Sequence, residues 1–564
     1  NGTIVLIAAS LILGTLANSL GNLAVGKPET SASCPTGQYA SSESSSGALM
    51  CSVVPNSTSI SIFYLNSTFI EAIFNGKMIA GGTNASVVIQ QTMNSCTAPC
   101  NIQIGNGTFT IGNMPLTPRN FEAIYGAGQQ VTILKLAPGV SRHLLFENTG
   151  HLLNFSIQNI GFDGNKYSQT DPSGTLARIN GELVLIAGIG NQHIYFKNDE
   201  CQNARTGACL DLTGYDVQLA DSVVQHNGVK GAVIPCDNVH MGGGNITLAA
   251  RVSNNFLIDA TDTSLAMDNV RGSTISGNYI ADGAASDMTL DRGSQADSVS
   301  ANTFNMTSYS GSWVASTVVE GSASQNISLS SNDFYENNHT TAINVHLINI
   351  VSSKSWTITG GTMVSSIEQP NDFMIQLQSD NNVNIHGVTL SSLSGTNPTG
   401  QSMIFINGGA NITVSGVNFY GGRIGFQFAS NVADALNILG NAFFGTLTPF
   451  FYDNNYPTNS VIRDNFGYDS VGKIPNFVYT VGGNFFAPWG SSGTLTPSTS
   501  YTITAIDQII TCTGGTGVSI NITDNHGNVL ASGSAAITLS YLPVGYTINF
   551  GPFSTAPTCT DSFN

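Results

Sequence analysis

The sequence predicts an all-β protein built as a long solenoid of short strands, with one hydrophobic α-helix before it and a small β-sandwich after it. Three observations carry this prediction: a pattern that recurs along the middle of the chain, an uncharged apolar start, and short alternating strands at the end. Only 9% of the 564 residues are charged, with 17 Lys and Arg against 34 Asp and Glu. This composition excludes coiled coils and argues against a nucleic-acid partner, which requires a basic surface.

Residues 1–26 form the first predicted element, and they carry no charge before Lys27. As a helix, the segment would be about 39 Å long at 1.5 Å per residue, which is enough to span a bilayer. Small residues such as Ser10, Gly14 and Gly21 interrupt it and favour close packing between helices. No Met precedes the apolar segment, so we expect that the chain has been processed. An ordinary secretory signal loses its apolar region on cleavage, whereas this chain is expected to retain its apolar helix.

This apolar start resembles an archaeal type IV pilin. Val5 stands where bacterial type IV pilins usually carry Glu, a residue that archaeal pilins generally lack. The resemblance implies a helix that lies in the membrane before assembly and then packs in the core of a helical homopolymer. A plain membrane anchor is the alternative. Residues 27–80, with the Ser-rich stretch 41–46, predict a stalk or collar above the helix.

Residues 81–490 carry a repeat of the form apolar-x-x-(Asn/Gly/Val)-x-apolar, which returns for the most part at intervals of roughly 23–30 residues, within the range of solenoid repeats. Its first apolar positions are Ile157, Ile194, Leu219, Val252, Ile275, Val299, Leu329, Ile358, Ile385, Val414, Ile438 and Ile462. Five residues later the position is apolar except at Asp199 and Gly467, and three residues after the start Asn recurs at Asn255, Asn278, Asn302, Asn332, Asn441 and Asn465. Such a period is typical of one solenoid coil, in which apolar side chains stack inside and Asn amides at a turn hydrogen-bond between coils.

The repeat region resembles the right-handed parallel β-helix of the pectin-lyase-like superfamily. Residues 85–93 look like the capping helix of that fold, and residues 102–111 and 123–134 look like its first coils. The resemblance implies the fold but no single activity, since enzymes, adhesins and viral spikes share it. Residues 491–564 then predict a C-terminal β-sandwich, because five short alternating strands are separated by turns such as 525–528.

The cysteines indicate an exported protein, and in an exported protein the Asn-x-Ser/Thr sequons are candidate glycosylation sites. Nine Cys are present and eight fall in close pairs, which predicts disulfides in an oxidising compartment and leaves Cys236 over. The pairs are Cys34 with Cys51, Cys96 with Cys100, Cys201 with Cys209, and Cys512 with Cys559. Besides Asn1, the predicted glycosylation sites are Asn56, Asn66, Asn84, Asn106, Asn154, Asn245, Asn305, Asn326, Asn338, Asn411 and Asn521.

Charged residues cluster only between positions 259 and 297. Asp268 and Asp291 are separated by the length of one repeat, as are Asp259 and Asp282, so each pair is expected on adjacent coils. With Arg271 and Arg292 beside them, Asp268 and Asp291 form a candidate carbohydrate or ion site, and a plain surface ladder with counter-charges is the alternative. Cys236, Asp237 and His240 make a second group near the Gly-rich loop 242–244.

No complete catalytic motif is visible. The Gly-His-Gly pattern of polygalacturonases is absent, and the nearest match is Ile385-His386-Gly387. Hydrolases need two carboxylates across a sugar, and no convincing set stands out. We therefore predict no catalytic residues, no metal and no cofactor, and expect that the chain is not an enzyme.

These observations predict a structural subunit of an extracellular type IV pilus-like filament. Its helix would lie in the membrane before assembly, and its glycosylated β-helix would face outward for adhesion, with surface glycans as the partner and no nucleic acid. A membrane-anchored surface polysaccharide lyase or glycoside hydrolase, acting on an acidic polysaccharide, is the first alternative. A viral or S-layer spike is the second. The low charge is typical of turn-rich all-β extracellular proteins, which are rich in Asn, Ser, Thr and Gly, and an acidic habitat, which protonates carboxylates, is the alternative explanation.

Overall fold

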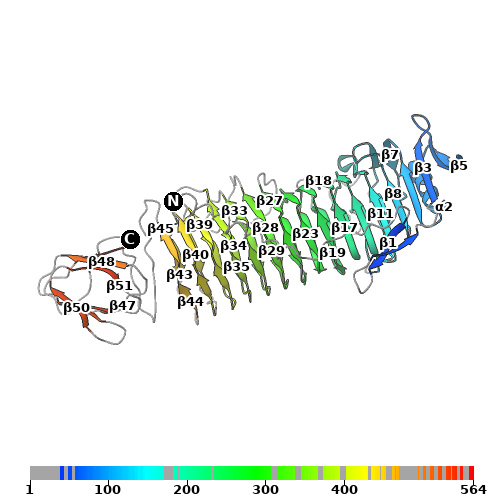
Figure 1. The fold of residues 1–564 in the computed structure, drawn as a ribbon. Coiled ribbons are helices and arrows are strands. Elements are labelled where there is room, and N and C mark those ends of the chain that lie inside the picture. The colour runs from blue at the N-terminus through cyan, green and yellow to red at the C-terminus, as the bar shows by residue number, and fades with distance from the viewer. Residues whose placement is uncertain are drawn as a thin grey trace, which may run out of the picture.

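The computed structural model describes most of residues 58–468 and separate strands before and after them (Figure 1). The predicted helix 1–26 lies outside the described residues. Also outside are 27–37, 44–48, 54–57, 141–142, 170–181, 189, 230–233, 307–314, 337–343, 366–372, 394–401, 430–433, 445, 447, 453–459, 464, 469–492, and the connections between the strands after 492.

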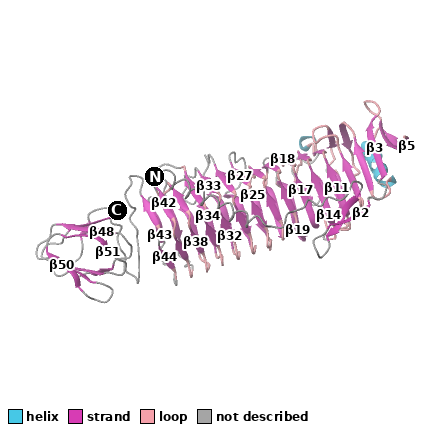
Figure 2. Ribbon diagram, viewed as in Figure 1, coloured by secondary structure: helices cyan, strands magenta, loops and turns pink. Residues whose placement is uncertain are grey.

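The described chain is a parallel β-helix, so the predicted fold class is confirmed (Figures 1 and 2). Each full coil contributes one strand to each of three sheets, here called sheets I, II and III, and each strand pairs in parallel with its equivalent in the next coil. Sheets I and II are joined where β19 continues from one to the other, since Leu248 of β19 pairs with Tyr215 of β17.

Sheet I consists of β10 (Leu145–Glu147), β13 (Val184–Ile186), β16 (Gly207–Leu212), β19 (Cys236–Leu248), β22 (Thr263–Arg271), β25 (Ser286–Asp291), β28 (Ala315–Ser322), β31 (Asn344–Val351), β34 (Phe373–Gln378), β37 (Ser402–Asn407), β40 (Ile424–Phe428) and β43 (Thr448–Tyr452). Sheet II consists of β3 (Thr58–Tyr64), β6 (Cys100–Ile104), β8 (Glu122–Tyr125), β11 (Leu153–Gln158), β14 (Gln192–Lys197), β17 (Tyr215–Ala220), β20 (Arg251–Ser253), β23 (Thr274–Ser276), β26 (Ser298–Ser300), β29 (Ser328–Ser330), β32 (Thr357–Thr359), β35 (Asn384–His386), β38 (Thr413–Ser415), β41 (Asn437–Leu439) and β44 (Val461–Arg463). Sheet III has 14 strands: β7 (Gly107–Ile111), β9 (Thr132–Leu136), β12 (Gly161–Asp163), β15 (Glu200–Gln202), β18 (Val223–Asn227), β21 (Phe256–Ala260), β24 (Tyr279–Ala281), β27 (Thr303–Met306), β30 (Asp333–Glu336), β33 (Thr362–Ser365), β36 (Thr389–Ser392), β39 (Asn418–Tyr420), β42 (Ala442–Phe444) and β45 (Phe466–Tyr468).

The start of the rod differs from the prediction. Part of the expected stalk 27–80 belongs to the rod, because β3 pairs in parallel with β6, and β4 (Ile70–Phe74) and β5 (Lys77–Gly82) extend it as an antiparallel meander. The predicted capping helix is present as α2 (Ala85–Ser95), whose buried residues Val88, Ile89 and Met93 join the core. Upstream, β1 (Gln38–Glu43) and β2 (Leu49–Val53) pair with each other, and a short 3-10 helix, η1, covers Lys166–Ser168.

The apolar positions of the repeat stack inside the rod as predicted. In sheet III, Leu257, Ile280, Phe304 and Phe334 pair coil by coil and are all buried. The Phe304 and Phe334 rings stack with centroids 4.9 Å apart. This column of side chains gives each coil an apolar surface that only the next coil can cover, so the coils stabilise one another.

The recurrent Asn side chains form the predicted ladder. The Asn278 Oδ1 accepts the backbone N–H of Asn255 at 2.9 Å and its side-chain amide at 3.0 Å, and Asn302 repeats both contacts with Asn278. Each amide also donates to a backbone carbonyl of the preceding coil, as Asn278 does to Val252. The left-handed backbone at this turn belongs to the residue before the ladder Asn, for example Asn254 with φ of 56°.

One coil was misaligned in the predicted repeat. Phe196, and not Ile194, pairs with Ile157 and Leu219. Counting from Phe196 places buried Cys201 at the inner position five residues later, and it places Asp199 at the ladder position. Asp199 accepts the backbone N–H of Ile160 at 2.9 Å, so the apparent exception at Asp199 disappears.

Beyond residue 492 the strands form two four-stranded antiparallel sheets, which agrees with the predicted C-terminal β-sandwich. They are β46 (Gly493–Thr494), β47 (Ser500–Thr502), β48 (Gln508–Thr513), β49 (Ser519–Thr523), β50 (Val529–Ser534), β51 (Ile537–Leu542), β52 (Thr547–Phe550) and β53 (Thr558–Phe563). Cys512 and Cys559 are direct partners across β48 and β53. Within the described residues, no helix is long and apolar enough to cross a membrane.

Candidate active site

A cluster of ionisable side chains lies on the outer face of sheet I. Its members alternate with buried apolar neighbours, so they point away from the core. For example, Asp211 lies between buried Leu210 and Leu212. We call the group the acid cluster; its residues are Asp211 of β16, His240 of β19, Asp268 of β22, Asp291 of β25, Glu320 of β28, and Arg292 directly after β25.

Parallel pairing brings these residues together from five consecutive coils. Asp211 is the register partner of His240, and Asp268 is the register partner of Asp291. Neighbouring strands lie about 4.8 Å apart, so register partners are nearest neighbours. The position of each side chain is therefore set by rigid strands and not by loops.

His240 links two carboxylates. Its Nδ1 lies 3.3 Å from Oδ2 of Asp211, and its Nε2 lies 3.7 Å from Oδ2 of Asp268. Burial alone would lower the pKa of His240, but its contacts with Asp211 and Asp268 raise that pKa well above the ordinary value. The ring is therefore a cation held between two acids.

Asp268 and Asp291 differ in electrostatic environment. Asp268 contacts Nη1 of Arg292 at 3.1 Å in addition to His240, so its charge is compensated from two sides. Burial, together with the nearby charges of Glu320 and Asp268, raises the pKa of Asp291 to about 7, although Asp291 accepts the backbone N–H of Ser322 at 3.0 Å. Burial also raises the pKa of Glu320.

This arrangement combines an ion-paired carboxylate with a neighbouring carboxylic acid that keeps its proton near neutral pH. Two carboxyl groups whose environments separate their protonation states are the usual equipment for acid–base work on a glycosidic bond. Carboxyl groups about 5 Å apart are typical of the retaining form of that chemistry. In the described part of the chain, no group of three or more His, Cys, Asp or Glu side chains is arranged to hold a metal ion.

The structure unites three of the four predicted ladder residues. Asp268, Asp291 and Arg292 come together, whereas Arg271 is exposed at the end of β22 and forms no ion pair among the described residues. Asp259 is also outside the cluster, because it contacts His226 on sheet III at 2.7 Å.

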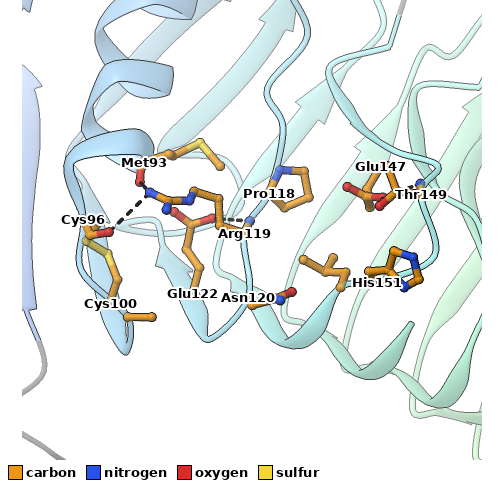
Figure 3. Close-up of a pocket in the computed structure, with 12 residues that line it drawn as sticks. Met93, Cys96, Cys100, Pro118, Arg119, Asn120, Glu122, Glu147, Thr149 and His151 are labelled. Carbon is orange, nitrogen blue, oxygen red and sulfur yellow. Dashed lines mark hydrogen bonds between the residues drawn. A yellow bond between two sulfur atoms is a disulfide. The ribbon is translucent and has the colours of Figure 1, made fainter. Parts of the chain in front are cut away.

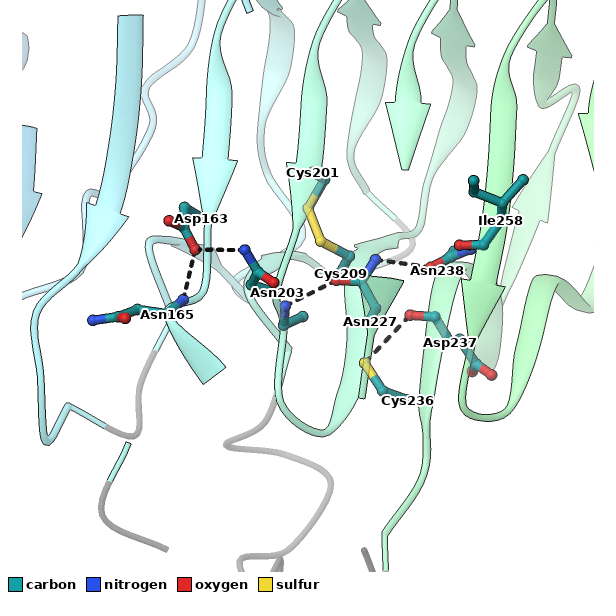
Figure 4. Close-up of a disulfide and its surroundings, with 11 residues drawn as sticks. Asp163, Asn165, Cys201, Asn203, Cys209, Asn227, Cys236, Asp237, Asn238 and Ile258 are labelled. Carbon is teal, nitrogen blue, oxygen red and sulfur yellow. Dashed lines mark hydrogen bonds between the residues drawn. A yellow bond between two sulfur atoms is a disulfide. The ribbon is translucent and has the colours of Figure 1, made fainter. Parts of the chain in front are cut away.

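The second predicted group, Cys236, Asp237 and His240, does not stay together in the structure. His240 belongs to the acid cluster, while Cys236 is buried and free near the disulfide between Cys201 and Cys209 (Figure 4). Its thiol contacts the carbonyl of Asp237 at 3.4 Å, and burial raises its pKa well above the ordinary value. A buried thiol of this kind is inert. Asp237 accepts the backbone N–H of Thr263 at 3.0 Å.

The sequence interpretation missed Asp211 and Glu320. A signal was present, because Asp211 lies one coil before His240, and Glu320 pairs with Thr289, two positions before Asp291. Both of these coils are longer than the coil from Asp268 to Asp291, so a search for the shorter interval does not find them. Loop length varies between coils, and a fixed spacing therefore identifies only some of the neighbours.

A hollow lies at the beginning of the rod, beside α2 (Figure 3). It measures about 380 Å³ and is lined by Arg119, Glu122, Glu147 and His151 among others. Arg119 donates to the carbonyls of Met93 at 2.8 Å and Asn94 at 2.9 Å, so it caps the end of α2. Its own backbone N–H bonds to Glu122 at 3.0 Å. These charged groups hold the helix on the first coils, and the acid cluster is the stronger candidate site.

Two predicted disulfides are present in the structure, Cys96–Cys100 and Cys201–Cys209. Cys34 lies outside the described residues.

Of the predicted glycosylation sites, seven side chains are exposed and Asn305 is half-buried, donating to the Tyr279 hydroxyl at 2.7 Å. The exposed ones are Asn66, Asn84, Asn106, Asn154, Asn245, Asn326 and Asn411. Asn1, Asn56, Asn338 and the side chain of Asn521 lie outside the described residues.

No family model matches the chain, and no curated protein matches it. Several solved structures are similar in fold. DFA-IIIase from Arthrobacter chlorophenolicus A6 in complex with DFA-III has 12% identity and a TM-score of 0.43, covering 59% of this chain and 91% of that one. The mannuronan C-5 epimerase A-module of Azotobacter vinelandii has 13% identity and a TM-score of 0.33, covering 68% and 94%. PfbA, a surface adhesin of Streptococcus pneumoniae, has 10% identity and a TM-score of 0.41, covering 71% and 93%.

These similarities correct one prediction. The sequence predicted that the chain is not an enzyme. That prediction is wrong, because two of these three structures with a similar fold are enzymes. At such low identity the likeness shows the fold alone. The reaction and its residues have to be argued from the acid cluster itself.

Proposed function

We propose that the chain is a glycan-cleaving enzyme whose active site is the acid cluster on sheet I. The observation that carries the proposal is the pair Asp268 and Asp291, which are register partners with different electrostatic environments. Asp291 would protonate the glycosidic oxygen as the bond breaks. The Asp268 carboxylate would attack or stabilise the positive carbon that this leaves, and water would complete the hydrolysis.

His240 and Arg292 support this division of roles. Their contacts hold the Asp268 carboxylate in one orientation and place positive charge beside it, while Glu320 and burial keep the proton on Asp291. Both acids stand on strands, which fix their separation more firmly than loops do. The carboxyl spacing expected from adjacent coils predicts retention of anomeric configuration.

The test is to incubate the purified chain with a panel of polysaccharides and to measure the release of new reducing ends. We expect cleavage of at least one polysaccharide class, and we expect the product to keep the anomeric configuration of the substrate when followed by proton NMR. Absence of cleavage across neutral and anionic polysaccharides, at pH 4 to 8, would refute the proposal. Inversion of configuration would refute the assigned roles of Asp268 and Asp291.

A second proposal concerns display. The uncharged apolar segment 1–26 supports attachment to a membrane or to a filament core, and the two disulfides support an extracellular location. We propose that the rod is presented outside the cell on a pilus-like filament, with adhesion as a use of the same glycan-binding surface. Electron micrographs of native material should show filaments, and finding only dispersed membrane monomers would contradict this.

A further inference from the structure

Beyond Glu320 of the acid cluster, a row of uncharged side chains continues along the outer face of sheet I. Register pairing defines it: Glu320 pairs with Asn349, Asn349 with Gln376, Gln376 with Phe405, and Phe405 with Gln427. We call these five residues the Glu320 row. Its members alternate with buried residues such as Ile375 and Leu377, so the row faces outward.

Gln376 in the middle of this row is unsatisfied. Its residue exposure is only 8%, yet its Oε1 accepts no hydrogen bond among the described residues. A buried amide oxygen without a partner costs free energy, and it is normally matched by water, an ion or a ligand. Gln376 lies two coils beyond Glu320 in the same row, which favours a ligand that extends from the acid cluster over both coils.

Phe405 supplies an apolar surface one coil further along. Its ring stacks on the ring of Phe373, with centroids 4.4 Å apart and planes 7° apart, which holds both rings in a fixed orientation. Next to Gln376, Asn349 accepts from the side chain of Gln378 at 3.4 Å. Amides for hydroxyl groups and a fixed aromatic ring for a sugar face are the usual combination for binding uncharged carbohydrate.

The charges favour the same conclusion. The Glu320 row contains no Lys or Arg, and the acid cluster holds four carboxyl groups with Arg292 and His240 as its cations. A polyuronate would place one further carboxylate per sugar beside these acids, and like charges in contact are unfavourable. Both cations are already engaged by Asp268.

From these observations we infer, building on the proposed function, that the substrate is a neutral polysaccharide. Its chain extends from Asp268 and Asp291 toward the C-terminal coils over Asn349, Gln376 and Phe405. The inference differs from the sequence-based alternative, in which the substrate is an acidic polysaccharide.

The experiment compares neutral polysaccharides (laminarin, inulin and mannan) with anionic ones (polygalacturonate and alginate) by affinity electrophoresis. The full chain is used, and the Asp291→Asn variant removes turnover. We expect the chain to bind a neutral polymer. The dissociation constant should change less than twofold when the salt concentration is raised from 50 to 500 mM, because no ion pair is involved. Replacing Phe405→Ala or Gln376→Ala should each weaken binding about tenfold. Tyr420→Ala, an exposed aromatic on sheet III, is the matched control and should bind normally.

The outcomes separate the two claims. Preference for the anionic polymers, or neutral binding that Phe405→Ala and Gln376→Ala leave unchanged, overturns the neutral-substrate inference even if the enzyme is active. Neutral binding of the expected kind by a wild-type chain that cleaves nothing overturns the proposed function and keeps the binding inference. Binding to neither class overturns both. Circular dichroism of each variant shows whether it folds. The Asn349→Ala variant is used in place of any variant that does not fold.

Discussion

Single residues set the chemistry of the outer face of sheet I. Asp268 is balanced by Arg292 and His240, whereas Asp291 is enclosed with Glu320 and keeps its proton to about pH 7. Side chains of the same type thus take different roles because their neighbours differ. The spacing of one repeat between Asp268 and Asp291 predicted this pair from the sequence. It did not predict Asp211, His240 and Glu320 as neighbours of the pair, because those contacts depend on loops of unequal length between coils.

The protonation of Asp291 predicts the pH dependence of the reaction. The folded-state pKa of about 7 lies above the ordinary value near 4, so the acid form persists up to neutral pH. Cleavage should therefore fall about tenfold per pH unit above pH 7 as the proton is lost. The measurement is the pH profile of kcat/KM on the substrate found in the screen. A rate that rises between pH 7 and 9 would show that Asp291 is not the acid.

At the scale of elements, the coils are held together by the inner apolar columns and by the Asn ladder. The apolar pattern predicted the register of nearly every coil, because side chains at equivalent positions must stack inside. The pattern failed at one coil, where Ile194 and Phe196 are both apolar and buried and only the pairing distinguishes them. Asp199 then occupies the ladder position, a substitution that a search for Asn does not reveal.

The ladder predicts a large cost for removing one rung. Asn302 is 1% exposed and accepts from Asn278 twice, while its own amide donates to Asn332 and to Ile275. Replacing Asn302→Ala leaves several buried groups unpaired, so the free energy of unfolding should fall by about 2 to 4 kcal/mol. Urea denaturation checks this, with the exposed Asn106→Ala as control. A loss below about 0.5 kcal/mol for Asn302→Ala would mean that the ladder does not stabilise the rod.

The whole molecule carries few charges, and several of its carboxyl groups are buried. Burial raises the pKa of Asp297 and of Asp380 to about 7 and that of Glu122 to about 8. One oxygen each of Glu122 and Asp297 has no partner among the described residues, which fits a protonated group. The uncharged turns that Asn, Gly, Ser and Thr supply explain the low charge content, and burial keeps part of the remaining acidic residues protonated in the folded state.

These buried acids predict that the fold is most stable in mild acid. In the unfolded chain each carboxyl loses its proton near pH 4, while the folded state keeps it to about pH 7 or 8. Between these values the folded state binds more protons, so stability is greatest near pH 4 and falls as the pH rises to about 8. Thermal denaturation should give a lower Tm at pH 8 than at pH 4.5.

Asparagine variants test the cause of that pH dependence. Asp297→Asn removes a titrating group but keeps an oxygen that accepts the backbone N–H of Ser273. Asp380→Asn keeps the acceptor for the Ser353 N–H and loses the one for the Gln378 N–H. Each should flatten the dependence of Tm on pH, whereas Asp221→Asn, at an exposed carboxyl on the surface, should leave it unchanged. A Tm that rises between pH 4.5 and pH 8 in the wild type would contradict the account.

The most direct test of the central claim compares three variants on the polysaccharide that the wild type cleaves. Asp291→Asn should lower kcat by about 100-fold or more, because a general acid contributes at least that much. Asp268→Asn should lower it by a similar factor, while Asp221→Asn makes the same chemical change outside the acid cluster and should keep the wild-type rate. If all three variants cleave at the wild-type rate, then the acid cluster is not the active site.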